Sequence, residues 1–321
     1  MKKVAIGIDI GGTNSAIGIV DEVGTVLTRG NIPTDRHSDI NLYIDDLAAE
    51  IERIIASTDV ELDIQGIGLG APNGNYYNGT IEFAPNLRWK GVVELTKLLS
   101  ERFNYPVIKL TNDANAAALG ESIYGCAKGL KNYIMITLGT GLGSGVVING
   151  DLVYGHDGFA GELGHVCVEH GGRECGCGRL GCLETYCSAT GLVRTAYELL
   201  GKSNKPSVLR EVVNTEKLTS KLIYKYAIEG DALANECFRF TAEKLGKALA
   251  DFTTFSSPEA FILFGGLANA GDLLIKPTKE YMEANMLEIF KNKVAIKPSE
   301  LPGADAAVLG ASSLVWKELS K

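Results

Sequence analysis

The hydrophobic positions of this chain follow two spacings, one typical of strands and one typical of helices. Short apolar runs that end in glycine or polar turns predict strands at 4–10, 15–20, 25–30, 64–70, 107–110, 133–138, 144–148, 152–154, 260–264 and 294–297. Apolar residues three or four positions apart predict helices at 40–57, 92–103, 112–124, 185–200, 273–290 and 304–319, with further helices before 254. Between two of these elements, 71–90 is a long polar loop, and loops of that length are more often functional than idle.

The first predicted strand ends in a glycine-rich turn that has one acidic residue before it. Asp9 lies near the end of the strand, and Gly11, Gly12, Thr13 and Asn14 form the turn. Glycine lets the backbone approach a bulky anion, and the N–H groups of such a turn can hold phosphate oxygens. Asp9 would then hold a magnesium ion, directly or through water. The alternative is a tight hairpin turn after a buried strand with one solvated acid.

The stretch 132–154 repeats this arrangement of strand, glycine turn, strand, turn and strand. Gly139, Thr140 and Gly141 belong to its glycine turn. Because the run leads into a strand rather than a helix, it is not a dinucleotide-binding fingerprint, and the chain has no P-loop run either. Two such turns from two similar halves predict a cleft in which an anion is held from both sides.

Two more strand ends carry residues suited to a binding site. Asn112 and Asp113 stand where a strand meets a helix, and a helix N-terminus keeps a carboxylate ionised and able to accept a proton. The alternative role is a helix cap, for which Asp and Asn are preferred, and the two roles are compatible. Gly265 and Gly266 end the strand at 260–264, where a nucleotide can lie close to the backbone.

The most specific spacing in the chain lies between 159 and 184. His165, Cys175, Cys177 and Cys182 offer one nitrogen and three sulfurs, a set that suits a structural, tetrahedral zinc ion. Cys167 and His170 compete as ligands, and spacing does not exclude them.

Two glutamates flank this cluster. Glu162 and Glu184 are either ordinary surface acids or carboxylates held in place beside a metal. Carboxylates fixed in that way are suited to bind the hydroxyls of a polyol by hydrogen bonds.

The composition narrows the partners. The net charge is -8 and the pI near 5.2, which argues against nucleic acid or an anionic membrane surface as partner. The sequence shows no signal peptide and no apolar run long enough to span a bilayer, so we expect a cytoplasmic protein. Five of the seven cysteines crowd into one short region, which in a reducing compartment indicates metal rather than disulfides.

Taken together, the motifs resemble one family, the ROK sugar kinases, and most closely its bacterial glucokinases. The matching segments are DIGGTN at 9–14, APN at 71–73, PNLRW at 85–89, NDANAAALGE at 112–121, LGTGLGSG at 138–145, GELGH at 161–165, CGCGRLGCLE at 175–184 and FGG at 264–266. The resemblance implies an α/β, actin-like (ribonuclease-H-like) fold of two domains with duplicated βββαβαβα units and an interdomain cleft. We expect a small N-terminal domain of 1–113 plus 304–321 and a large domain of 114–303 that contains the zinc loop.

The resemblance also implies roles for single residues. Asp113 matches the catalytic base, which takes the proton from the sugar 6-hydroxyl. The sugar-binding positions are Asn86, Asn112, Glu162, His165 and Glu184, with His165 also matching the zinc set of Cys175, Cys177 and Cys182. The phosphate turns are Gly11, Gly12, Thr13, Gly139, Thr140 and Gly141, and the nucleotide side is Gly265–Gly266. Asn14 is a departure, because many members have Lys there.

The implied activity is ATP-dependent phosphorylation of a hexose at O6, with Mg²⁺ and with glucose favoured. Alternative substrates are mannose, fructose, N-acetylglucosamine and N-acetylmannosamine, and polyphosphate is an alternative donor. The family also includes sugar-sensing repressors with an N-terminal helix-turn-helix domain, which a chain whose first strand begins by Val4 is not expected to have. A zinc-held sugar-binding protein without catalysis is a third possibility. The family usually forms homodimers or homotetramers.

Overall fold

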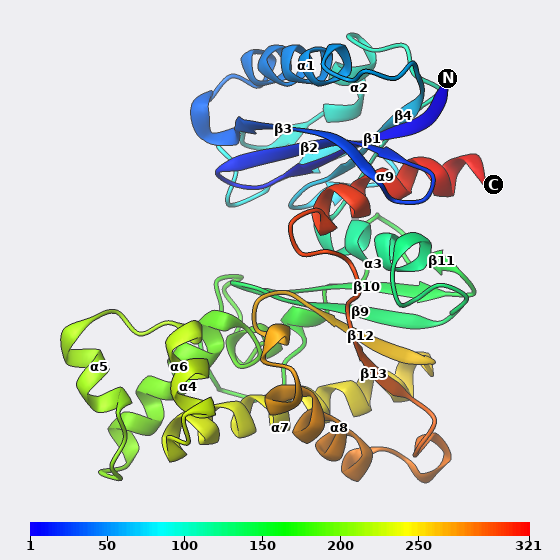
Figure 1. The fold of residues 1–321 in the computed structure, drawn as a ribbon. Coiled ribbons are helices and arrows are strands. Elements are labelled where there is room, and N and C mark those ends of the chain that lie inside the picture. The colour runs from blue at the N-terminus through cyan, green and yellow to red at the C-terminus, as the bar shows by residue number, and fades with distance from the viewer. The chain divides into compact units, whose positions relative to one another are not determined.

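The computed structural model describes all 321 residues, which divide into two compact units (Figure 1). The first unit contains Met1–Leu130, Gly145–Gly161 and Ser299–Lys321. The second unit contains Lys131–Ser144 and Glu162–Pro298. No helix is long and apolar enough to cross a membrane.

The first unit is built on a five-stranded sheet in which antiparallel and parallel pairs are combined. Its strand order is β3(Val26–Pro33), β2(Asn14–Asp21), β1(Lys2–Ile10), β4(Leu62–Gly70) and β8(Val107–Thr111). β1 pairs antiparallel with β2 and parallel with β4, and β8 continues the parallel side. The carboxyl ends of β1, β4 and β8 therefore meet at one edge of the sheet.

Helices cover both faces of this sheet (Figure 1). On one face, α1(Ile40–Ala56) buries Tyr43, Leu47 and Ile51 against the isoleucines of the strands. On the other face lies α9(Ala306–Leu319), whose backbone touches the sheet at two glycines. A Cβ on Gly7 would lie 2.1 Å from the Val308 carbonyl oxygen, and one on Gly68 would lie 1.9 Å from that of Ala311. Any larger residue at these positions would displace the helix.

The second sheet repeats the order of the first. It runs β11(Asp151–Leu152), β10(Leu142–Ile148), β9(Tyr133–Leu138), β12(Ala260–Phe264) and β13(Ala295–Pro298). β12 is parallel to β9 and β13, as β4 is parallel to β1 and β8. The repeat predicted from the sequence is confirmed as a duplicated sheet.

Besides β9, β12 and β13 of the second sheet, the second unit contains five α-helices. They are α4(Ala189–Lys202), α5(Leu209–Thr215), α6(Ser220–Ile228), α7(Ala232–Ser256) and α8(Asp272–Asn285). α7 buries an apolar face that includes Phe238 and Leu245, and it packs against α8 through Gly246. Pro277 lies inside α8, beyond the first turn, so the helix lacks the hydrogen bond that an N–H at this position would donate to the residue four before it.

Two predicted elements are corrected by the structure. The predicted loop 71–90 contains strands β5(Gly74–Asn75) and β6(Thr80–Glu82), which form a small antiparallel sheet with β7(Val92–Val93). The predicted helix at 92–103 is therefore shorter, and α2 covers only Leu95–Ser100. β-branched Val92 and Val93 favour the strand over the helix.

The expected domain boundary after Asp113 also differs from the structure. α3(Asp113–Tyr124) belongs to the first unit, because it crosses α9 at two glycines. A Cβ on Gly120 would lie 3.0 Å from Cα of Gly310, so the two helices are in backbone contact. The segment Gly145–Gly161 joins the same unit, since Gly145 packs on α3 in the same way.

Candidate active site

Two aspartates stand at the carboxyl ends of the parallel strands of the first unit. Asp9 pairs with Gly70, and Gly70 pairs with Thr111, so three strand ends lie side by side. A Cβ on Gly70 would lie 3.6 Å from Cα of Asp113 and 3.7 Å from Oδ1 of Asp9. The sheet therefore brings both aspartates to the same place, on either side of a residue without a side chain.

The strand–helix junction holds Asp113 in a defined position. Asn112 is the N-cap of α3, and its Oδ1 accepts a hydrogen bond of 2.8 Å from the Ala114 N–H. Oδ1 of Asp113 accepts from the same N–H, also at 2.8 Å. The cap predicted from the sequence is present, and it leaves Oδ2 of Asp113 outside that hydrogen bond.

The electrostatics of the pair favour a bound cation. Burial raises the pKa of Asp9 to about 6, and the nearby charge of Asp113 adds to the shift. Desolvation also raises the pKa of Asp113, although N–H groups of Ala114 and of Asp113 itself oppose it. Asp113 is exposed to solvent, so the raised pKa of its carboxyl comes from protein atoms packed around it and not from complete burial. No cationic side chain contributes to either shift, which leaves room for a metal ion.

The first glycine turn is held by two backbone hydrogen bonds and packs beside Asn86. The Gly11 N–H donates to the Asn14 carbonyl oxygen at 3.0 Å, and the Thr34 N–H donates to that of Thr13 at 2.8 Å. A Cβ on Gly12 would lie 2.9 Å from the Asn86 carbonyl oxygen. The exposed Asn86 therefore lies next to this turn.

A buried polar network supports the same turn. The Ser15 hydroxyl lies 2.6 Å from that of Thr34 and 2.7 Å from that of Tyr43. The Tyr43 ring packs at 4.4 Å against the Trp89 ring, which belongs to the segment that carries Asn86. Ser15, Thr34 and Tyr43 look like ordinary core positions in the sequence, so they are not among the predicted site residues.

The second glycine turn lies in the second unit and is held by four hydrogen bonds. The Gly139 N–H donates to the Gly141 carbonyl oxygen at 3.0 Å, and the Ala189 N–H donates to that of Gly139 at 2.8 Å. The Thr190 hydroxyl donates to the Thr140 carbonyl oxygen at 2.8 Å. The fourth bond, of 2.9 Å, runs from the Leu142 N–H to Oε2 of Glu184.

Gly141 is required by that carboxylate. A Cβ on Gly141 would lie 2.2 Å from Oε2 of Glu184, well inside contact distance. Oε1 of the same carboxylate lies 3.7 Å from Sγ of Cys175. Glu184 thus links the second glycine turn to the cysteine cluster.

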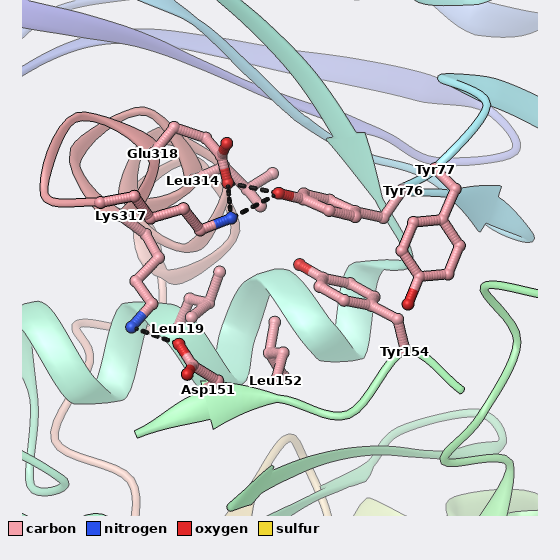
Figure 2. Close-up of a pocket in the computed structure, with 10 residues that line it drawn as sticks. Tyr76, Tyr77, Leu119, Asp151, Leu152, Tyr154, Leu314, Lys317 and Glu318 are labelled. Carbon is pink, nitrogen blue, oxygen red and sulfur yellow. Dashed lines mark hydrogen bonds and ion pairs between the residues drawn. The ribbon is translucent and has the colours of Figure 1, made fainter. Parts of the chain in front are cut away.

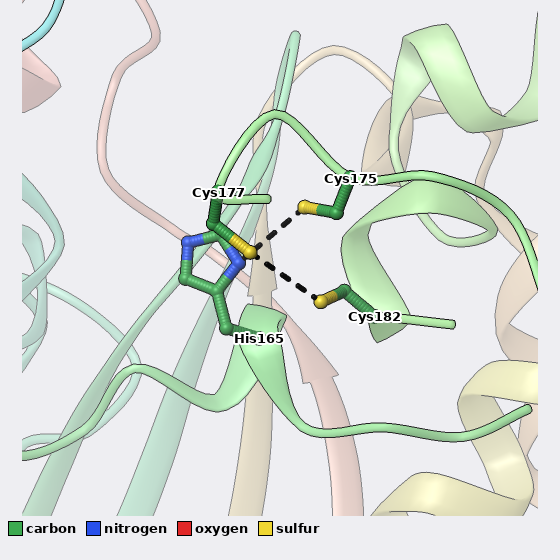
Figure 3. A group of neighbouring side chains, drawn as sticks. All are labelled: His165, Cys175, Cys177 and Cys182. Carbon is green, nitrogen blue, oxygen red and sulfur yellow. Dashed lines mark hydrogen bonds between the residues drawn. The ribbon is translucent and has the colours of Figure 1, made fainter. Parts of the chain in front are cut away.

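Four of the predicted metal ligands gather around one point (Figure 3). The ligand atoms of His165, Cys175, Cys177 and Cys182 all lie within 4.8 Å of one another. Sγ of Cys177 is 3.7 Å from Sγ of Cys182, and Sγ of Cys175 is 3.7 Å from Nδ1 of His165. In tetrahedral zinc geometry, sulfur ligands lie about 3.8 Å apart and sulfur and nitrogen about 3.6 Å apart. The donor set fits a closed zinc site.

Cys167 and His170 form a separate pair. Sγ of Cys167 is 3.7 Å from Nδ1 of His170, and neither residue belongs to the group of four. All seven cysteines are free of disulfides.

The remaining sugar-binding candidates of the second unit lie at two short 3₁₀ turns. Glu162 precedes the turn Leu163–His165, and its carbonyl oxygen accepts a hydrogen bond of 3.1 Å from the His165 N–H. Glu184 lies inside the turn Leu183–Thr185, which begins after Cys182. Because Nδ1 of His165 faces Cys175, its other ring nitrogen remains available for a second ligand.

Gly266, the second of the paired glycines after β12, borders a cavity in the second unit. Gly265 has φ +103°, and a Cβ there would lie 2.7 Å from the Leu138 carbonyl oxygen. The cavity holds about 210 Å³ and is lined by Ser220, Lys221, Tyr224, Phe238, Gly266, Leu267, Asn269 and Ala270. Its aromatic residues are Tyr224 of α6 and Phe238 of α7, and its aliphatic residues, Leu267 and Ala270, follow β12.

A second cavity, in the first unit, contains none of the predicted site residues (Figure 2). The Tyr76 and Tyr154 rings stack there at 4.1 Å. Lys317 binds Asp151 at 2.9 Å, and Lys321 binds Glu318 at 2.6 Å. Since each charge on the rim has a protein partner, the cluster ties α9 to the β10–β11 hairpin and to the segment after β4.

The predicted site residues therefore fall into two sets. Asp9, Gly11, Gly12, Thr13, Asn14, Asn86, Asn112 and Asp113 lie in the first unit. Gly139, Thr140, Gly141, Glu162, His165, Cys175, Cys177, Cys182, Glu184, Gly265 and Gly266 lie in the second unit.

Comparison with known proteins identifies relatives that match nearly the whole of this chain. A glucokinase of Halalkalibacterium halodurans is 36% identical over 316 residues, which are 98% of this chain and 95% of that protein. A xylose repressor of Caldicellulosiruptor bescii is 29% identical over 320 residues, which are 98% of this chain but 78% of the repressor.

A solved structure is similar over the same extent. The crystal structure of a ROK family glucokinase from Streptomyces griseus, in complex with glucose and AMPPNP, matches with a TM-score of 0.78 and 34% identity. The match covers 98% of this chain and 99% of that one. The ROK family model itself matches residues 5–318. The chain therefore belongs to the ROK family and has its two-domain, actin-like fold.

Proposed function

We propose that this protein is an ATP-dependent hexose kinase that transfers a phosphoryl group to O6 of its substrate, with glucose as the favoured sugar. The support comes from the glucokinase relatives and from the two sets of site residues. The observation that carries the proposal is Asp113, an oriented carboxylate at a helix N-terminus beside Asp9 and the ends of three parallel strands.

Asp113 is proposed as the general base. Its hydrogen bond to the Ala114 N–H fixes one oxygen and leaves the other to accept the proton of the sugar hydroxyl. Desolvation raises the pKa of the Asp113 carboxyl, and a raised pKa makes its carboxylate a stronger base than that of a free aspartate. Phosphoryl transfer requires mainly positioning and charge stabilisation, so a base of this kind contributes about two to four orders of magnitude.

The two glycine turns are proposed to bind the phosphates of ATP. Their N–H groups are natural donors to phosphate oxygens, and Gly265–Gly266 would border the nucleotide. Asp9 would hold Mg²⁺, which neutralises phosphate charge when it is bound. A cation at this position offsets the cost of a carboxylate whose pKa lies near 6.

Sugar recognition is proposed for Asn86, Asn112, Asp113, Glu162, His165 and Glu184. Zinc, when bound by His165, Cys175, Cys177 and Cys182, would act structurally, since four protein ligands leave no open position. Its effect would be to fix His165 and Glu184 for hydroxyl groups. We further propose a cytoplasmic location and a homodimer or homotetramer, in line with the family.

The proposal is tested with purified protein, Mg-ATP and a panel of glucose, mannose, fructose, N-acetylglucosamine and N-acetylmannosamine. ADP release would be measured for each sugar, with zinc content determined on the same preparation. We expect the highest kcat/KM on glucose and about one zinc per chain, from the single four-ligand group. No turnover on any sugar would exclude the kinase, and sugar binding without turnover would favour a non-catalytic sensor.

A further inference from the structure

Arg173 is a buried arginine in the metal loop to which the proposed mechanism gives no role. Its side chain is 6% exposed and lies two residues before Cys175. Its guanidinium group makes five hydrogen bonds, which equals its number of N–H donors. The acceptors are both carboxylate oxygens of Glu198 (2.8 and 2.9 Å), the carbonyl oxygens of Thr185 (2.6 Å) and Gly191 (3.2 Å), and the Thr195 hydroxyl (2.9 Å).

These contacts enclose the short turn that carries Glu184. Thr185, the residue after Glu184, is held by the Arg173 side chain. On the other side of the turn, the Gly181 N–H donates to the Arg173 carbonyl oxygen at 2.8 Å, directly before Cys182. The Arg173 N–H donates to the Tyr186 hydroxyl at 2.9 Å, and the guanidinium carbon lies 4.4 Å from the centre of that ring. One residue thus fixes both ends of the segment 181–186.

The segment 181–186 that Arg173 fixes contains Glu184, whose carboxylate makes two further contacts. Glu184 accepts the hydrogen bond of Leu142 at the phosphate turn and lies against Sγ of Cys175. A small displacement of its backbone would change both contacts at once, because the two oxygens of one carboxylate make them.

We propose that Arg173 is a positioning residue for hexose recognition, which holds Glu184 in place through the Thr185 carbonyl and helix α4 without itself touching the sugar. This inference rests on the proposed function. The planar fork is essential to it, since bidentate binding of Glu198 and two carbonyl oxygens lies beyond a lysine ammonium. Arg173 also lowers the pKa of the Glu198 carboxyl through their hydrogen bonds, which keeps the pair ionised.

The test is Arg173→Lys, with Arg194→Gln as the matched control. Arg194 also binds a carbonyl oxygen of the metal loop, that of Glu174 at 2.8 Å, but it is exposed and lies outside the segment 181–186. Arg173→Lys should raise the glucose KM by about 10-fold, as expected when hydrogen bonds of a charged group are lost, with kcat changed by less than about 3-fold. The control should leave both constants unchanged.

A general loss of folded protein would lower apparent kcat and leave KM unchanged, so an unchanged glucose KM in folded Arg173→Lys protein overturns the inference. If this variant does not fold, Glu198→Gln replaces it, since it keeps the shape and weakens the same bonds. It should raise KM by about 3-fold, and no change would again contradict the role.

Amide hydrogen exchange gives a readout that does not depend on turnover. Exchange over 181–186 should become faster in Arg173→Lys than in the wild type, and it should remain slow in Arg194→Gln. If the wild type phosphorylated no hexose, the proposed function would fail, and the inference would be decided by exchange alone. Unchanged exchange over this segment would then overturn it.

Discussion

The candidate site residues of the first unit and those of the second unit are held in place in different ways. In the first unit, Asp9 and Asp113 are placed by regular structure, at the ends of paired strands and the start of a helix. In the second unit, Glu162, His165 and Glu184 lie at short turns. His165 and Glu184 are placed there by non-covalent contacts with other side chains, such as that of Glu184 with Cys175. A sheet holds its strand ends through many backbone bonds, whereas a loop depends on a few specific groups.

This difference predicts what each set of residues can tolerate. Single substitutions around Asp113 should change the chemistry and leave the geometry intact, because the sheet and the cap remain. Single substitutions around the metal group should change binding, because one lost ligand or hydrogen bond displaces the whole turn. Substitutions in both sets test this contrast.

The largest effect is expected for Asp113→Asn. The amide keeps the size of the side chain but cannot accept the proton, so kcat should fall by about 10²–10⁴-fold with glucose affinity retained. Steady-state kinetics and calorimetric titration with glucose would measure the two quantities. A kcat near the wild-type value would remove Asp113 from the base role.

The next largest effect is expected for Cys182→Ser in the metal group. Loss of a buried ligand should release the metal and raise the glucose KM by at least about 10-fold. Zinc analysis and kinetics check this expectation. Cys167→Ser is the matched control, since Cys167 lies in the same loop but outside the group of four, and it should retain metal. Equal loss in both variants would contradict the ligand set.

A smaller effect is expected at the second glycine turn. Gly141→Ala places a Cβ against Glu184 and should raise the glucose KM by about 10-fold. Gly139→Ala in the same turn meets no heavy atom within 4 Å, so its effect should be clearly smaller. The ratio of the two KM values is the measurement. A larger effect from Gly139→Ala would show that the Glu184 contact is not what Gly141 protects.

A further expected effect concerns stability rather than turnover, namely its dependence on pH in the protein without nucleotide or Mg²⁺. The folded pKa of Asp9, about 6, lies above the value of 3.8 expected in the unfolded chain. The native state therefore binds more protons between these values, and stability falls as pH rises from about 4 to about 6. Asp9→Asn removes this cost, so it should stabilise the protein by up to about 3 kcal/mol at pH 7.5 and by less than about 1 kcal/mol at pH 4.

Asp21→Asn is the control with the opposite sign. Burial raises the pKa of Asp21, but bonds from Lys2 and from the Thr25 and Val23 N–H groups outweigh it and hold the pKa below the usual value. Its stabilisation is present above the unfolded pKa and is lost as pH falls through the folded pKa. Asp21→Asn should thus destabilise at pH 7.5, and urea unfolding of both variants at two pH values decides the matter.

Much of the first unit could be predicted from the sequence because its signals are local. Apolar runs that end in or before glycine marked β1 and β4, and the pair Asn112–Asp113 marked the start of α3. The cysteine spacing likewise predicted the group that gathers in space.

The features that the sequence did not predict depend on contacts between distant segments. β5 and β7 have two residues each, too short for any alternation to appear. The unit boundary depends on the glycine contact between α3 and α9, which are separated by most of the chain. Arg173 looks like a surface charge until its acceptors on α4 are known.

The position of α9 has a consequence for biosynthesis. Gly7 and Gly68 lie in strands that are synthesised early, whereas the helix that packs on them begins only at Ala306. The sheet that the ribosome makes first is therefore covered last on this face. The intervening residues 131–298 have emerged and can fold before that happens. A nascent chain stalled shortly before 306 would thus expose one apolar face of its first sheet, a surface suited to chaperone capture.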